Sequence, residues 1–145
     1  MSFIKCYGKL IIPSLSIETY IWKFKNISKY GDTVCLFFGI DNANNPNCIN
    51  KCLFRNKLKA SYSYYVDDGR INDWTGREVF NDMQQMSQND IITMKLQFTE
   101  NNGILTFQLN DNKEIIASNN IKRDKSLKYR MTINMGTPRL SVQLL

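Results

Sequence analysis

The last third of the chain alternates apolar and polar residues with a period of two, and this pattern constrains the fold most. Apolar side chains occupy every second position from 92 to 98 and again from 105 to 109: Ile92, Met94, Leu96, Phe98, Leu105, Phe107 and Leu109. Polar turns at 100–103, which contains a glycine, and at 110–113, which is rich in asparagine, follow the two runs. Half-buried antiparallel strands joined by hairpins produce such a pattern. We therefore predict a hairpin-rich β structure.

Extended segments recur along the rest of the chain. Alternation marks residues 20–24, 129–135 and 140–144, with turn residues between the segments. Residues 33–40 are apolar on both faces, which indicates a central strand covered on both sides, and residues 53–66 are predicted to form a further strand region. No sustained helical period or internal repeat occurs, and we interpret residues 70–89 as one long connection, a type of loop that is often functional. Many short strands at this spacing predict a sandwich or barrel. The 145 residues are expected to form one domain, 1–145, on which a lead segment, 1–19, packs.

Composition excludes several kinds of chemistry. The chain contains no histidine, so catalysis by a Ser-His or Cys-His pair and histidine-bound metals are excluded for this chain alone. Asp67 and Asp68 are adjacent, so along a strand their carboxylates would point to opposite sides, which is unsuited to paired acid catalysis. We expect a protein that is not an enzyme, with no cofactor and no metal.

The four cysteines, Cys6, Cys35, Cys48 and Cys52, are irregularly spaced. We favour reduced structural thiols, because free cysteine is usually buried. A four-thiolate zinc site is the alternative. No apolar run approaches the roughly 20 residues of a membrane span, and the first residues lack the pattern of a signal peptide. We expect a cytoplasmic or nuclear protein with no membrane partner.

The order of these segments resembles the SPRY domain family over roughly residues 20–145. In the first half, the resemblance rests on a Trp-bearing strand at 20–24, an apolar strand ending in Gly-Ile at 36–40, and an aromatic strand before a glycine turn at 62–69. In the second half, it rests on an Asn-Asp lead at 89–92, a Leu-Thr-Phe-Gln-Leu-Asn strand at 105–110 and a penultimate strand at 129–133. Asn89 and Asp111 stand where the family usually has glycine. Both changes are compatible with a turn, since asparagine tolerates positive φ.

The resemblance implies an all-β fold, a bent two-sheet antiparallel β-sandwich of the SPRY or concanavalin-like type. It also implies a non-catalytic protein-interaction module, an adaptor or subunit of a larger assembly, that grips a peptide segment of a partner protein through loops at one end. We predict the partner-binding residues in the polar turn and loop after residue 66, where anchor-type side chains occur: Asp67, Asp68, Arg70, Trp74 and Arg77. Trp22, flanked by aromatic residues, is predicted to be in the core.

A different class of function stays open because the net charge is +6. Arg55, Lys57 and Lys59 fall on one face of an expected strand, and a second basic cluster spans residues 122–130. A basic stripe is typical of nucleic-acid binding, and a small OB-fold-like β-barrel acting as a nucleic-acid-binding accessory subunit is the alternative. A solvated face is the simpler interpretation of these charges.

The sandwich interpretation also predicts a core. Leu96, Phe98, Leu105, Phe107, Ile133 and Leu140 are expected to lie together and to face Trp22 and Leu36 across the two sheets.

Overall fold

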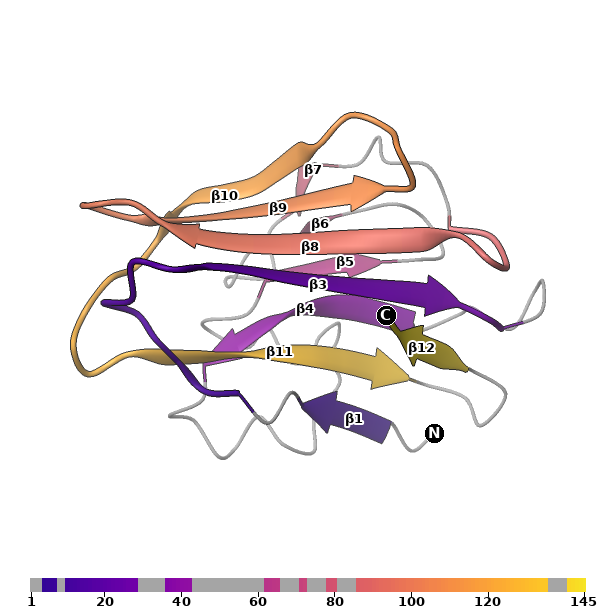
Figure 1. Cartoon of the computed structure of the whole chain (residues 1–145), viewed down its shortest axis with the longest axis horizontal. Coiled ribbons are helices and arrows are strands. Elements are labelled where there is room, and N and C mark those ends of the chain that lie inside the picture. The colour runs from indigo at the N-terminus through magenta and orange to yellow at the C-terminus, as the bar shows by residue number, and fades with distance from the viewer. Residues whose placement is uncertain are drawn as a thin grey trace.

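The computed structural model describes residues 4–7, 10–28, 36–42, 62–65, 71–72, 78–80, 86–135 and 141–145, and every regular element in these ranges is a strand. The strands form two sheets (Figure 1). The β11 sheet contains β1 (Ile4–Tyr7), β11 (Lys128–Met135), β4 (Leu36–Asn42), β5 (Tyr62–Tyr65), β6 (Ile71–Asn72) and β7 (Glu78–Phe80) in that order, with β2 (Ile12–Pro13) also paired to β11. The β8 sheet has the order β10 (Ile115–Ile121), β9 (Gly103–Leu109), β8 (Ile91–Phe98), β3 (Thr19–Asn26) and β12 (Val142–Leu144).

All strand pairs in the described part of the chain are antiparallel. The predicted two-sheet antiparallel sandwich is thus confirmed. The alternative, a small closed barrel, is wrong, because the strands divide into two separate sheets instead of one sheet closed on itself.

The hairpin of β8 and β9 has the register that the alternation requires. Met94 lies opposite Phe107 and Leu96 lies opposite Leu105, so the apolar residues of both strands share the inner face. Gly103 starts β9 at a crowded point, where an added Cβ would lie 2.9 Å from Cβ of Ile121 and 3.0 Å from Cε1 of Phe98. The glycine of the predicted turn is therefore needed for close packing between strands.

Asparagine fills two backbone positions that favour glycine. Asn89 has a φ of 70° and Asn110 a φ of 51°, a region that asparagine enters more readily than most other residues. The predicted tolerance of asparagine at position 89 is confirmed. In the second turn the positive φ falls on Asn110 itself, whose Oδ1 also accepts a hydrogen bond from the Ile91 amide at 2.9 Å.

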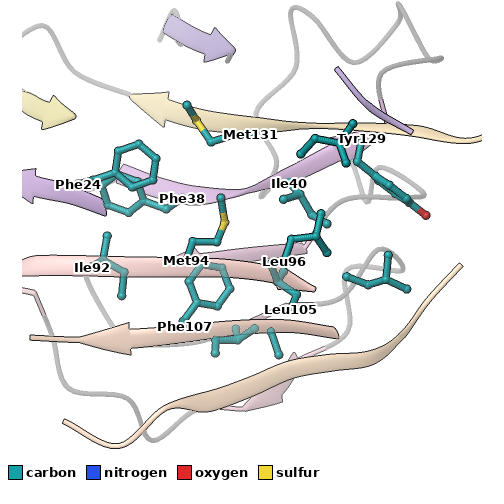
Figure 2. Close-up of a cluster of buried hydrophobic side chains, with 14 of the residues drawn as sticks. Phe24, Phe38, Ile40, Ile92, Met94, Leu96, Leu105, Phe107, Tyr129 and Met131 are labelled. Carbon is teal, nitrogen blue, oxygen red and sulfur yellow. The ribbon is translucent and has the colours of Figure 1, made fainter. Parts of the chain in front are cut away.

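The core lies between the two sheets. Figure 2 shows side chains of both sheets in one cluster, and Phe24 of the β8 sheet stacks on Phe38 of the β11 sheet with ring centroids 5.0 Å apart. Leu96, Leu105 and Phe107 are fully buried. Each large side chain buried here contributes about 1.5–3 kcal/mol through the removal of apolar surface from water.

For the residues whose side chains are described, the predicted core is confirmed in membership but wrong in arrangement. Trp22 and Ile133 pack against the core while partly exposed. Trp22 pairs with Met94 in the β8 sheet, beside Leu96 and not across from it, whereas Ile133 belongs to the β11 sheet and pairs with Phe38. The alternation reports which residues face inward but not which sheet a strand joins. The side chains of Leu36 and Leu140 lie outside the described residues.

We predicted one uninterrupted connection over residues 70–89. This prediction is wrong, because the short strands β6 and β7 lie within these residues. The segment before residue 20 also contributes strands, since β1 and β2 both pair with β11. Cys35, Cys48 and Cys52, and most of the expected strand 53–66, lie outside the described residues.

Candidate functional site

The five predicted partner-binding residues, Asp67, Asp68, Arg70, Trp74 and Arg77, all lie outside the described residues, but their flanking strands are defined. Residues 66–70 connect β5 to β6, and residues 73–77 connect β6 to β7. The strands β5, β6 and β7 form a meander in which each strand pairs antiparallel with the next. The two connections therefore attach at opposite ends of this meander. Residues 73–77 attach at the end where β11 begins and β4 ends.

That end of the sandwich also holds three described connections. Residues 14–18 lead from β2 to β3, residues 99–102 from β8 to β9, and residues 122–127 from β10 to β11; all three lie at the left in Figure 1. We call this the Arg123 end, because one arginine ties the three connections together. Two of them, 14–18 and 122–127, cross from one sheet to the other.

The guanidinium of Arg123 donates hydrogen bonds to backbone carbonyl oxygens on two neighbouring connections. Its Nε donates to the Ser14 carbonyl at 3.0 Å, and Nη1 donates to the carbonyls of Thr99 and Glu100, both at 2.6 Å. Nη2 donates to the Leu15 carbonyl at 3.0 Å and makes a longer contact of 3.5 Å with the Ser16 carbonyl. The planar fork of donors on arginine suits such multiple contacts. Arg123 thus acts as a clamp, a role that our interpretation of residues 122–130 as a basic cluster did not predict.

Ser14 and Asp124 reinforce the clamp. The buried Ser14 hydroxyl accepts a hydrogen bond from the Asp124 amide at 2.8 Å and donates to the Asp124 carbonyl, while the Ser14 amide donates to the Leu127 carbonyl at 3.0 Å. Hydrogen bonds from the backbone and then the hydroxyl of Ser126 lower the pKa of Asp124; desolvation opposes them, and the charge of Lys122 adds the least of the contributions. This carboxylate caps its own turn, so residues 122–127 are held from within.

Aromatic packing fixes the same connection to the core. The ring of Tyr129 stacks on Phe98 of the opposite sheet, with centroids 6.4 Å apart, and its hydroxyl donates to the Lys122 carbonyl at 2.9 Å. Tyr129 is buried, so this hydrogen bond joins the connection to the interior.

The clamped segment presents apolar side chains to solvent. We define the aliphatic patch as the exposed Leu10, Ile11, Leu15 and Ile17; Ile17 is 88% exposed and Leu15 is 50% exposed. Large apolar side chains gathered on a surface mark interaction sites more often than single ones do. Our sequence reasoning treated residues 1–19 only as a lead segment and missed this feature. The run of aliphatic residues from 10 to 17 was the available signal.

Lysines border the patch. Lys122, Lys125 and Lys128, which we call the lysine rim, are exposed, and Lys128 pairs with Pro13 beside the patch. Arg55, Lys57 and Lys59, the residues predicted for nucleic-acid binding, lie outside the described residues. Arg130, the last member of the second basic cluster, is half-buried.

The opposite end of the β8 sheet has a different character. Asn26 accepts a hydrogen bond from the Ser28 amide through Oδ1 at 3.0 Å and donates from Nδ2 to the Ser87 carbonyl at 3.2 Å. Asn110 donates to a carboxylate oxygen of Asp90 at 3.0 Å, and the other carboxylate oxygen of Asp90 accepts from the Ser87 amide at 2.7 Å. These polar side chains satisfy backbone groups and each other, as turn-forming residues do.

In the part of the chain that the structure describes, no group of three or more metal-ligating side chains gathers, and no helix has the length and apolar character to cross a membrane.

No protein-family model matches the sequence, and a search of curated proteins finds no significant match. Solved structures do match. The SPRY domain of human HERC1 superposes with a TM-score of 0.76 at 14% identity, covering 99% of this chain and 82% of that one. The TRIM65 PSpry domain gives a TM-score of 0.65 at 10% identity, covering 98% of this chain and 69% of that one. The lectin UEA-II, in a complex with galactose, gives a TM-score of 0.62 at 8% identity, covering 99% of this chain and 78% of that one.

Identities this low establish architecture and not activity. Two SPRY domains match nearly the whole of the present chain, and the order of sequence segments resembles the same family. The chain therefore has the fold of a SPRY domain.

Proposed function

We propose that the chain is a non-catalytic protein-interaction module, an adaptor or subunit of a larger assembly, which binds a segment of a partner protein through the loops of the Arg123 end. The observation that carries the proposal is the clamp of Arg123 beneath an exposed aliphatic patch. Binding surfaces lose less entropy on association when their loops are already ordered. A fixed backbone that presents apolar side chains is suited to recognition.

The fold supports this proposal by analogy. Loops on a rigid β scaffold are where binding residues usually lie, and the SPRY resemblance implies the same kind of module.

The predicted anchors Trp74 and Arg77 fit this location. The connection that carries them attaches at the Arg123 end of the β11 sheet, whereas the one that carries Asp67, Asp68 and Arg70 attaches at the other end of the meander. Trp and Arg are enriched among residues that dominate binding energy. We therefore propose Trp74 and Arg77 as the principal anchors of the predicted five.

Affinity purification of the tagged chain, with identification of the proteins that co-purify, tests the proposal. The double variant Trp74→Ala with Arg77→Ala is expected to release a specific partner while its melting temperature stays nearly unchanged, because exposed substitutions rarely change stability by more than about 0.5 kcal/mol. Lys23→Ala, a substitution of an exposed residue on β3, serves as the control that keeps the partner. A double variant that unfolds yet binds until it unfolds would show that Trp74 is a core residue.

Nucleic acid as the partner would have a different signature. Binding by counterion release weakens steeply as salt rises. We expect only weak, sequence-independent binding of short single strands at physiological salt. Tight stoichiometric binding that is abolished by changing Arg55, Lys57 and Lys59 to Glu would favour the nucleic-acid alternative.

A further inference from the structure

We propose that the partner segment at the Arg123 end is aliphatic and acidic, with apolar side chains on the aliphatic patch and carboxylates on the lysine rim. This inference rests on the proposed function and names the chemistry of the partner. It also assigns the binding surface to residues of the lead segment, 10–17, and to the lysine rim.

The first step is the apolar character of the patch. Four large aliphatic side chains are exposed between residues 10 and 17: Leu10 at 54%, Ile11 at 49%, Leu15 at 50% and Ile17 at 88%. Scattered exposed apolar residues are normal on protein surfaces. Four on one short segment form a local concentration along the chain, which favours an apolar partner surface.

The second step is the rigidity of the segment. The carbonyls of Ser14, Leu15 and Ser16 all face Arg123, and Ser14 is also hydrogen-bonded to residues 124 and 127. The side chains of Leu15 and Ile17 therefore project from a backbone that is fixed on at least one side. The aliphatic patch is preformed and does not need to order when a partner binds.

The third step is charge. Residues 122–128 contain four cationic side chains and one anionic side chain, so their formal charge is 4 − 1 = +3. The three lysines of the rim are exposed beside the patch, while the single carboxylate of Asp124 is hydrogen-bonded to Ser126. Complementary charges around an apolar centre guide association and select partners. The rim thus favours carboxylates next to the apolar side chains of the partner.

A protein segment fits this surface better than an anionic membrane does. Glu18 and Glu100 are exposed on two of the connections at the same end, and their carboxylates would repel a uniformly anionic surface. A peptide can place single carboxylates against the lysines and avoid Glu18 and Glu100.

The test uses synthetic peptide libraries and the whole chain. One library combines Leu, Ile and Phe with Asp and Glu, and a second replaces Asp and Glu with Lys and Arg at the same positions. Binding is measured by fluorescence polarisation, in parallel with sedimentation with phosphatidylcholine vesicles that contain phosphatidylserine. We expect selection from the acidic library only, and no sedimentation with vesicles.

Variants of a selected complex locate the contact. Leu15→Ser with Ile17→Ser is expected to weaken the selected peptide by about tenfold or more, as truncated anchors do. Ile116→Ser, whose side chain is 60% exposed on β10, is the matched control and should leave binding unchanged. Lys122→Glu with Lys125→Glu should weaken binding as well, whereas Lys113→Glu, in the turn before β10, should not.

Three results would overturn the inference. These are selection of basic or uncharged peptides, vesicle binding that the Leu15 and Ile17 variant abolishes, and no selection from either library. Loss of binding in the Trp74 and Arg77 variant, with the patch variants still active, would overturn the inference but leave the proposed function standing. If the Trp74 and Arg77 variant and the patch variants all keep the co-purified partner, the proposed function is contradicted.

Discussion

Replacing Arg123 with alanine removes the donors that tie residues 14–16 to residues 99–100. Four of the five contacts are hydrogen bonds of 2.6–3.0 Å. We expect Arg123→Ala to lower the free energy of unfolding and to loosen the Arg123 end, while the two sheets keep their core.

The expected magnitude follows from the surroundings of each carbonyl. The bond to the Ser14 carbonyl is partly buried, and a buried acceptor left without a donor costs about 1–3 kcal/mol. The carbonyls of Leu15, Thr99 and Glu100 accept in exposed surroundings, where water replaces the lost donor, so we assign these three together about 1 kcal/mol. The total is about 2–4 kcal/mol, a large fraction of the stability of a typical domain.

Urea unfolding followed by tryptophan fluorescence measures this loss. The midpoint should fall at a nearly constant slope, because the surface exposed on unfolding barely changes. Lys125→Ala, an exposed substitution on the same connection, should change stability by no more than about 0.5 kcal/mol, and Arg123→Lys should be intermediate because an ammonium cannot reproduce the fork of donors. If Arg123→Ala costs no more than Lys125→Ala, the carbonyl contacts do not stabilise the fold and the clamp argument fails.

Three further predictions address the core, a turn and a titrating group. Phe107→Ala should cost about 3–5 kcal/mol as a fully buried aromatic truncation, whereas Ile116→Ala should stay within about 0.5 kcal/mol; equal losses in chemical denaturation would contradict the core assignment. Asn110→Gly should be more stable than Asn110→Ala, since only alanine adds strain at a φ of 51°, on the order of 1 kcal/mol; the reverse order in thermal unfolding would refute this reasoning. The pKa of Asp124 is lowered from its ordinary value of 3.8 by Ser126, so its contribution to stability is present above that value and is lost as pH falls through the lowered pKa. Ser126→Ala keeps the backbone hydrogen bond to Asp124 and removes the one from the hydroxyl, so carbon-detected NMR titration should show a partial rise of the pKa of Asp124, and no change would contradict the contribution of the hydroxyl.

The local sequence was sufficient to predict the strands of the final third. The inward residues of β8 and β9 follow directly from the alternation, because a strand with one buried face places every second side chain in the core. Asn89 was likewise legible as a turn residue, since asparagine accepts a positive φ more readily than most other residues. In the second turn the sequence drew attention to Asp111, whereas the positive φ falls on Asn110. The SPRY-type sandwich followed from the order of such segments, each of which is weak evidence alone.

The short strands were less accessible. β6 has two residues and β7 has three, so neither contains enough positions to show a period. Their pairing with β5 and with each other, and not their own sequence, makes them strands. The prediction of one long connection from 70 to 89 failed for this reason, and the predicted site residues Trp74 and Arg77 consequently attach to a meander that the sequence did not reveal.

Tertiary structure alone decided the Arg123 end. The alternation placed Trp22 and Leu96 in the core but not in the same sheet, because periodicity gives the face of a strand and not its neighbour. Arg123 reads in sequence as one of several cations in a basic stretch, yet it contacts carbonyls more than 100 positions away in residues 14–16. Contacts at such separation depend on which strand ends meet when the two sheets pack, and no local pattern encodes that meeting.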